Sequence, residues 1–176
     1  MKIETDRLVL RDFVPNDLPA YIEIQSDPRW LTHYEWEDRD PDDVRALFAN
    51  FLLWQREQPR IKFQIAITLE GLVIGSCGIR KDNAAATQGD IGYELHPDHW
   101  GNGYATEAAR AMVDYGFNEL GLHRVWSWCI ADNEGSAKVL HRVGMTLEGR
   151  KKETQFFKGE WHDELIFGLL ASDRPG

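Results

Sequence analysis

The stretch DHWGNGYATEAARAM, residues 98–112, carries the chain from a predicted strand into a long amphipathic helix. Gly101 and Gly103 stand where this helix begins. The first N–H groups of a helix have no partners within it, and the helix dipole makes that end positive. Glycine has no Cβ and therefore lets a bound anion come close to the backbone. The stretch is accordingly either an ordinary tight turn or a binding site for an anionic group such as phosphate.

Two familiar nucleotide-binding motifs do not fit this turn. A Walker loop requires Lys followed by Ser or Thr after its last glycine, whereas Tyr104 and Ala105 follow here. A dinucleotide fingerprint requires a third small residue at the proper spacing and an acidic residue at the end of the next strand. The turn by itself therefore does not identify its ligand.

Residue periodicity around the turn predicts a mixed α/β fold in one domain that spans residues 1–176. No repeat, low-complexity tract or linker marks a boundary within the chain. The predicted helices cover residues 15–27, 41–57, 104–120 and 134–143. The predicted strands cover residues 7–13, the two runs of a hairpin within 62–81, and then 90–97, 123–132, 145–157 and 160–171.

Composition limits the partners and the location of the protein. The formal net charge of −9 would repel a nucleic acid backbone, and it either serves solubility or favours a cationic substrate. No run reaches membrane-spanning length, and the N-terminal MKIETDRLVLRDF lacks the apolar core of a signal peptide. We therefore expect a cytoplasmic protein with no nucleic acid or membrane partner. Cys77 and Cys129 lie in apolar runs and are interpreted as inert core thiols.

Three segments, GYEL (92–95), WGNGYATEA (100–108) and NEGSAKVLHRVGM (133–145), together resemble the GNAT superfamily of acetyl-CoA-dependent N-acetyltransferases, in particular its RimJ and RimL branch of ribosomal-protein N-terminal acetyltransferases. The superfamily signature R/Q-x-x-G-x-G/A is matched from Trp100 to Ala105, although Trp100 replaces the usual Arg or Gln. The resemblance extends from ETDRLVLR (4–11) to the W-x-D-E-L segment (161–165). It implies a mixed, mostly antiparallel sheet of about six to seven strands, flanked by about four helices. This sheet would be splayed between its fourth and fifth strands, often with a bulge in the fourth.

The resemblance also gives the anion a chemical identity. It implies that backbone N–H groups at the turn hold the pyrophosphate of coenzyme A, and that the pantetheine arm runs along the strand at 90–97. A backbone N–H near Leu95 would donate to the acetyl carbonyl as the tetrahedral intermediate forms. The implied cofactor-binding residues are Leu95, Gly101, Asn102, Gly103, Tyr104, Ala105, Thr106, Asn133 and Ser136.

Asn133 and Ser136 have two interpretations. Both residue types are common at helix starts, so capping of the helix at 134–143 would explain them without any ligand. In the RimJ and RimL branch, by resemblance, the N-x-x-S pair contacts the pantetheine, and the serine is the proposed donor to the departing thiolate. Many other GNAT members carry a tyrosine four residues later for this role, where Leu140 stands here. Ser136 is therefore the candidate acid.

The amine must lose a proton, and the residue that accepts it is less clear from the pattern. Aligned from Ser136, the glutamate proposed as base in RimL falls at Gln155, whose amide cannot accept a proton. Glu94, next to Leu95, is the alternative base by analogy with other GNAT members, or it is a solvent-facing carboxylate of an alternating strand. A water chain, or selection of the neutral amine, would need no base at all.

Tyr34, Glu35 and Trp36 fall where GNAT members line the acceptor pocket. An aromatic and acidic rim would suit a cationic amine, and the alternative is an ordinary hydrophobic anchor for the loop. His96 and His99 flank a proline turn without an evident third ligand, so we expect no metal site.

The resemblance therefore predicts an N-acetyltransferase that moves an acetyl group from acetyl-CoA directly to a primary amine, without a covalent enzyme intermediate. The acceptor is either a protein N-terminal amine or a small-molecule amine. A non-catalytic module that senses acyl-CoA is the alternative, because Gln155 and Leu140 replace an expected glutamate and tyrosine. The long C-terminal hairpin is consistent with a homodimer by family analogy.

Overall fold

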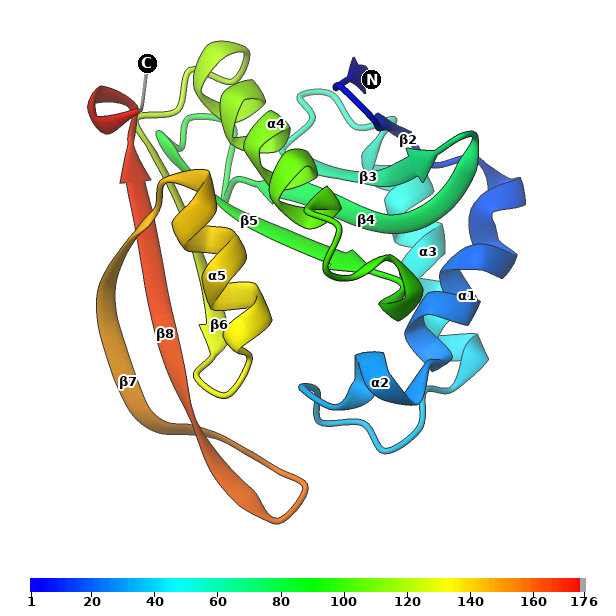
Figure 1. Cartoon of the computed structure of the whole chain (residues 1–176). Coiled ribbons are helices and arrows are strands. Elements are labelled where there is room, and N and C mark those ends of the chain that lie inside the picture. The colour runs from blue at the N-terminus through cyan, green and yellow to red at the C-terminus, as the bar shows by residue number, and fades with distance from the viewer. Residues whose placement is uncertain (175–176) are drawn as a thin grey trace.

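In the computed structural model, which describes residues 1–174, one open sheet of eight strands runs in the order β1-β2-β3-β4-β5-β6-β8-β7 (Figure 1). Neighbouring strands are antiparallel except β5 and β6, which are parallel. The strands are β1 (Lys2–Glu4), β2 (Val9–Asp12), β3 (Lys62–Leu69), β4 (Leu72–Arg80), β5 (Gln88–Leu95), β6 (Arg124–Ile130), β7 (Thr146–Phe157) and β8 (Glu160–Leu170). The α-helices are α1 (Leu18–Ser26), α2 (Pro28–Leu31), α3 (Pro41–Trp54), α4 (Tyr104–Asn118) and α5 (Glu134–Val143).

The predicted mixed, mostly antiparallel fold is confirmed, with one strand and one helix beyond the expected numbers. The additional strand β1 has three residues and pairs with β2. The additional helix α2 is a single turn, started by Asp27, whose side chain accepts a hydrogen bond from the Arg29 N–H. Neither segment is long enough to repeat a hydrophobic period, so periodicity could not reveal them.

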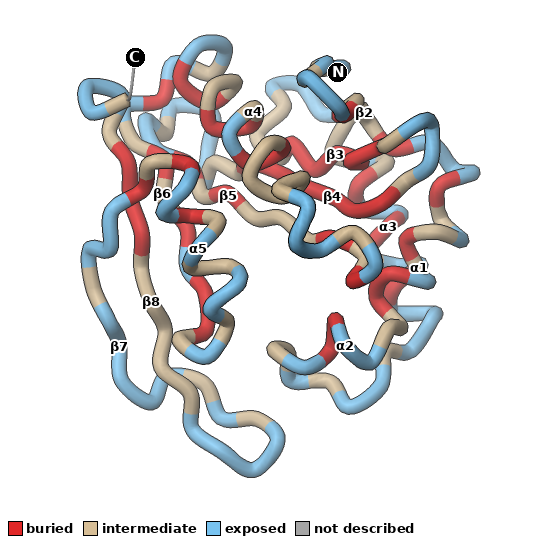
Figure 2. Tube along the Cα trace, in the orientation of Figure 1, coloured by how far each residue is buried: buried red, intermediate tan, exposed pale blue. Residues whose placement is uncertain are grey.

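Helices cover both faces of the central strands. Figure 1 shows α4 and α5 on one face of the sheet, and α1 and α3 pack on the other. Alternate residues of β3 face the two helical layers. Ile65 and Ile67 belong to the core under α4. Ala66 packs on the other face with Tyr21 and Phe48. Six consecutive residues of β3 are buried as a result, as expected for a strand enclosed on both sides. Figure 2 shows the contrast with the edge strand β7, which is mostly exposed.

The sheet opens between β5 and β6. The two strands pair only from Gln88 with Arg124 to Asp90 with Trp126, and beyond these pairs they diverge (Figure 1). This is the splay that the resemblance implies. The accompanying bulge is absent from the β4–β5 ladder, which runs without a register shift from Gly75 opposite Leu95 to Arg80 opposite Asp90. The opening therefore results from the early end of the parallel pairing.

One further prediction concerns membranes. Among residues 1–174, no helix combines the length and the apolar character needed to cross a bilayer.

Candidate active site between strands β5 and β6

The backbone of β5 directs one set of its polar groups into the opening. The His96 N–H donates to the Ile74 C=O at 2.8 Å, so residues of even number in this strand pair with β4. The intervening residues Tyr93 and Leu95 direct their N–H and C=O groups to the other side. The indole Nε1–H of Trp100 accordingly donates to the Leu95 C=O at 3.0 Å. The predicted position of the Leu95 N–H, facing the opening, therefore follows from regular alternation without a bulge.

Helix α4 begins at the opening with an uncapped N-terminus. Gly101 and Gly103 have φ angles of 78° and 82°, a left-handed conformation that glycine adopts without strain. No side chain caps the helix at Gly103, and the first intrahelical bond is the one from the Glu107 N–H to the Gly103 C=O. The N–H groups of residues 104–106 therefore have no partner within the helix. The two interpretations of the turn are compatible, since the tight turn leaves these donors exposed to a ligand.

Arg7, which the sequence analysis missed, holds this turn in place. Its guanidinium donates to the Asn102 C=O at 2.9 Å and pairs with the Glu107 carboxylate at 2.7 Å. The same group lies over the Tyr104 ring, 4.5 Å from its centroid. Thr5 adds a hydrogen bond to Glu107 at 2.6 Å. The signal for this role was the opening segment ETDRLVLR, which contributed to the resemblance without an assigned contact.

On the side of the sheet that carries α5, Tyr93 and Ser136 contact each other. The Tyr93 hydroxyl donates to the Ser136 C=O at 3.0 Å and lies 2.9 Å from the Ser136 Oγ. Asn133 caps α5 through its side-chain oxygen, which accepts from the Ser136 N–H at 3.0 Å. Leu140 is fully buried in the core, so this helix offers no second hydroxyl at that position. Tyr93 is a functional candidate that sequence reasoning missed, because nothing local links it to Ser136.

On the opposite side of the sheet, Glu94 is enclosed by hydrogen-bond donors. Its Oε1 accepts from the Ser76 Oγ at 2.8 Å, and its Oε2 accepts from the Gln25 Nε2 at 3.0 Å. Burial raises the pKa of Glu94, and the bonds from Ser76, Tyr21 and Gln25 oppose this rise. Glu94 is therefore a partly buried carboxylate with both oxygens hydrogen-bonded, which keeps it as the candidate base. A partly buried carboxylate whose pKa is raised above its ordinary value becomes a better proton acceptor once it is ionised.

The aromatic residues predicted for the acceptor pocket form a stack. The Tyr34 ring packs against Trp30 and Trp36 with centroid distances of 4.1 Å and 5.7 Å, and the two indoles are 6.4 Å apart. The Arg39 guanidinium covers Trp36 at 3.9 Å. Trp30 is buried, so the stack does anchor the loop. Burial and the charge of Glu94 both raise the pKa of Tyr34. Glu35 is exposed.

On the C-terminal hairpin, Gln155 contacts a carboxylate from the neighbouring strand. Its amide Nε2 donates to the Glu164 Oε1 at 2.7 Å, and the Glu164 side chain is only 12% exposed. Glu164 therefore supplies a carboxylate next to the position where the resemblance expected one. Sequence reasoning missed it because the two residues meet only through the pairing of β7 with β8.

The two cysteines are held as thiols. Burial raises the pKa of Cys77 and raises that of Cys129 to about 11. Neither sulfur is ionised near neutral pH, so neither is poised as a nucleophile. Within residues 1–174, no group of three or more His, Cys, Asp or Glu side chains is arranged to hold a metal ion.

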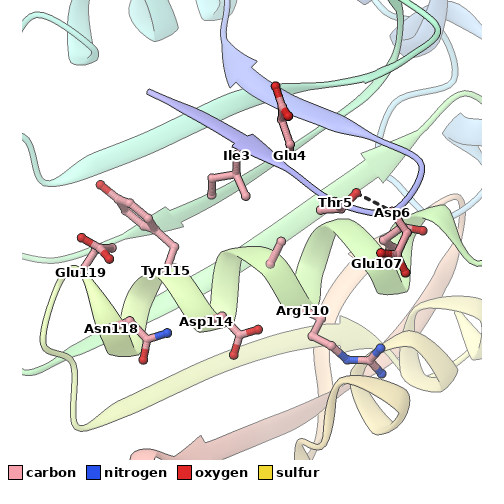
Figure 3. Close-up of a pocket in the computed structure, with 11 residues that line it drawn as sticks. Ile3, Glu4, Thr5, Asp6, Glu107, Arg110, Asp114, Tyr115, Asn118 and Glu119 are labelled. Carbon is pink, nitrogen blue, oxygen red and sulfur yellow. Dashed lines mark hydrogen bonds between the residues drawn. The ribbon is translucent and has the colours of Figure 1, made fainter.

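A hollow of about 470 Å³ lies along α4 on the side that faces β1 (Figure 3). Its carboxylates include Glu4, Glu107 and Asp114, which pair with Lys2, Arg7 and Arg174 respectively. This hollow is therefore a groove of mixed surface charge that contains none of the predicted site residues.

The opened sheet, the uncapped helix and the polar groups on both sides of β5 are the features that an acyltransferase with an anionic acyl carrier requires. The chain belongs to the acetyltransferase (GNAT) domain family, whose model matches residues 7–146. It is an acetyl-CoA-dependent acetyltransferase, which confirms the predicted family and cofactor.

Individual relatives agree with this assignment. The uncharacterized N-acetyltransferase YnaD of Bacillus subtilis is 31% identical, over 98% of this chain and 99% of its own. The ribosomal-protein-serine acetyltransferase of Escherichia coli is 26% identical over 89% and 88% of the two chains. A crystal structure of a GNAT-family acetyltransferase from Bacillus anthracis is 28% identical, covers 97% of this chain and 98% of its own, and gives a TM-score of 0.83.

Proposed function

We propose that the protein transfers the acetyl group of acetyl-CoA directly to a primary amine held at the opening between β5 and β6. The observation that carries this proposal is the presence of two sets of backbone donors along the opening, one for each end of the acyl carrier. These are the uncapped N–H groups at the start of α4 and the Leu95 N–H at the end of β5. Proximity of two bound substrates supplies most of the rate in such a direct transfer.

The residues at the turn fit the anionic end of the cofactor. The N–H groups of residues 104–106 match a pyrophosphate, and the Thr106 Oγ1 is a buried hydroxyl without a hydrogen-bond partner among the described residues. Gly101, Asn102 and Gly103 keep the approach free of bulky side chains. Acetyl-CoA, when bound, supplies the acetyl group as a thioester.

Three groups of this chain act on the acyl transfer itself. The Leu95 N–H donates to the developing oxyanion. The Ser136 hydroxyl donates to the departing thiolate, and Tyr93 positions this residue by donating its own O–H to the Ser136 C=O at 3.0 Å. Glu94 accepts the proton of the amine from the opposite side of β5, held in place by Ser76 and Gln25.

The acceptor belongs to the class of primary amines. The Escherichia coli relative named above is a ribosomal-protein-serine acetyltransferase, and a relative matched over 40% of this chain is a spermidine N(1)-acetyltransferase. A protein N-terminal amine and a small-molecule amine therefore both fall within the proposal. In the aromatic cluster of Trp30, Tyr34 and Trp36, the Arg39 guanidinium already lies over the Trp36 ring, so an aromatic face in this loop does hold a cationic group.

An acceptor screen tests the function directly. Purified protein, acetyl-CoA and a panel of N-terminal peptides, polyamines and other primary amines are combined, and released coenzyme A thiol is measured. We expect thermal stabilisation by acetyl-CoA and thiol release with at least one amine. Stabilisation without thiol release across the panel would support the acyl-CoA sensor, for which Gln155 and Leu140 are the motivating observations. Absence of any thermal shift would refute both.

Ser136→Ala is expected to lower turnover by roughly tenfold with little change in acetyl-CoA affinity. The effect lies at the low end of general acid catalysis because a thiolate of pKa about 8.5 leaves readily. Tyr93→Phe should lower turnover less, and it should add nothing in the Ser136→Ala background, since both act through one hydroxyl. Steady-state kinetics of the two single variants and the double variant measure this coupling. Wild-type turnover in Ser136→Ala would leave that residue with a capping role only.

A further inference from the structure

A second hollow, of about 440 Å³, lies beside the start of α4 and gathers three arginines from different segments. Arg7 comes from the loop before β2, Arg110 from the second turn of α4, and Arg142 from the end of α5. Asp6 and Glu107 also line it, and Glu107 is already paired with Arg7 at 2.7 Å. The three arginines outnumber the two carboxylates, so the lining has a small net positive charge in a chain of net charge −9.

Arg110 and Arg142 carry charges that no carboxylate balances. Both side chains are exposed, and no acidic group of the described residues lies within ion-pair distance of either guanidinium. Arg110 points toward α5 (Figure 3) and donates one N–H to the Arg142 C=O at 2.7 Å. This contact holds Arg110 across the hollow. The other N–H groups of the Arg110 and Arg142 guanidinium groups are free to bind a phosphate in the bidentate manner that guanidinium groups favour.

The hollow adjoins the turn that the proposed function assigns to the pyrophosphate. Gly103 and Thr106 line it, and Arg110 lies one helical turn after Thr106 on the same face of α4. Coenzyme A carries a second anionic group, the 3′-phosphate of its adenosine, a short distance from the pyrophosphate. Two separated anions on one ligand match an uncapped helix start and a neighbouring pair of unbalanced arginines.

We propose that Arg110 and Arg142 bind the 3′-phosphate of coenzyme A and make the protein discriminate against dephospho-coenzyme A. This inference rests on the proposed function, because it takes coenzyme A as the ligand of the turn. The competing explanation is structural, since arginines near a helix C-terminus also stabilise its last carbonyls. The explanations differ in one measurable respect, because only a phosphate site affects the two forms of the cofactor unequally.

Isothermal titration calorimetry with coenzyme A and with dephospho-coenzyme A tests the inference without any turnover. We expect the wild type to bind coenzyme A roughly tenfold or more tightly, as charge-assisted bonds to one phosphate allow. The double variant Arg110→Ala with Arg142→Ala should bind both compounds equally, at about the wild-type affinity for dephospho-coenzyme A. The matched control Arg45→Ala with Arg56→Ala removes the same charge at exposed positions in and after α3 and should keep the preference.

Each other outcome overturns a defined part of the proposal. Equal wild-type affinities for the two compounds would refute the 3′-phosphate site and leave the proposed function standing. Equal weakening of both by the double variant would assign the arginines to the pyrophosphate or to the helix ends. Failure of the wild type to bind either compound would refute the proposed function together with the inference. If the double variant does not fold, competition by adenosine 3′,5′-bisphosphate against ADP on the wild type gives the same answer, and equal competition refutes the site.

Discussion

Gly103→Val is expected to abolish measurable binding of coenzyme A while the protein still folds. Gly103 has a φ of 82°, and a β-branched residue in this left-handed region costs roughly 1–2 kcal/mol or more. The turn would relieve the strain by changing its backbone, and the N–H groups of residues 104–106 would then no longer converge on one anion. The added side chain would also project toward the Arg7 guanidinium, which lies 3.5 Å from the position of a Cβ. Calorimetric titration with coenzyme A measures the loss.

The opposite end of the same helix offers a matched control. Gly121 also has a positive φ, of 62°, and a Cβ placed there meets nothing within 4 Å. Gly121→Val should therefore lose a similar amount of stability, a drop in Tm of roughly 2–4 °C for each kcal/mol of strain, and keep its affinity for coenzyme A. Equal affinities in the two variants would remove the turn at Gly101 and Gly103 from the cofactor site.

Glu94→Gln is expected to lower kcat/KM near neutral pH by about a hundredfold or more, because an amide cannot accept the proton of the amine. In the wild type, the carboxyl group must ionise before it acts, so activity rises as the pH increases through its pKa. Burial raises that pKa above the ordinary value of 4.5. The acid limb of the pH–rate profile should therefore lie at a higher pH than an ordinary glutamate would give. The limb should disappear in Glu94→Gln and move to still higher pH in Ser76→Ala, which removes a bond to the charged form.

Stability gives an independent check on the same group. A carboxyl group whose pKa is raised in the folded state disfavours folding once it ionises. The wild type should therefore lose stability as the pH rises from about 4.5 through the folded pKa, and Glu94→Gln should not show that loss. Thermal unfolding of both proteins as a function of pH measures the difference. Lower stability of the variant at all pH values would mean that the loss of activity reflects a disturbed fold.

Glu164→Gln separates the two candidate bases. Glu164 is an enclosed carboxylate on the hairpin, and it accepts a hydrogen bond from Gln155. We expect its replacement to leave the acid limb where it is. A limb that survives Glu94→Gln and disappears in Glu164→Gln would transfer the role of base to Glu164. A limb that survives in both variants would belong to the amine itself.

Local pattern was sufficient for the parts of the site that lie within one continuous segment. Gly101 and Gly103 could be predicted because a left-handed turn before a helix requires glycine whatever surrounds it. Asn133 could be predicted as a cap for the same local reason. Residues 90–97 and 123–132 could be predicted as neighbouring strands only through the resemblance, because their parallel pairing spans an entire helix.

The remainder of the site depends on contacts between distant residues, which no local pattern encodes. The hydrogen-bonded residues Gln25 and Glu94 are 69 positions apart in the sequence. Arg7 and Glu107, which also bind each other, are 100 positions apart. Tyr93 and Ser136 meet only once β5 and α5 lie side by side. The contacts of Glu94 with Gln25 and Ser76 could not be predicted, because alternation predicts which face a side chain takes and not which side chains from other elements cover that face.

The alternation of β5 has a consequence for how this enzyme can diversify. Tyr93 and Glu94 are adjacent in sequence but point to opposite faces of the sheet. Tyr93 faces the side of α4 and α5, whereas Glu94 faces α1. In the proposed reaction the sheet thus acts as a partition, with the acyl carrier on one side and the amine on the other. Substitutions in α1 or residues 27–40 can then change the choice of amine while the carrier side keeps its structure. A single strand would separate the variable half of the enzyme from the constant half.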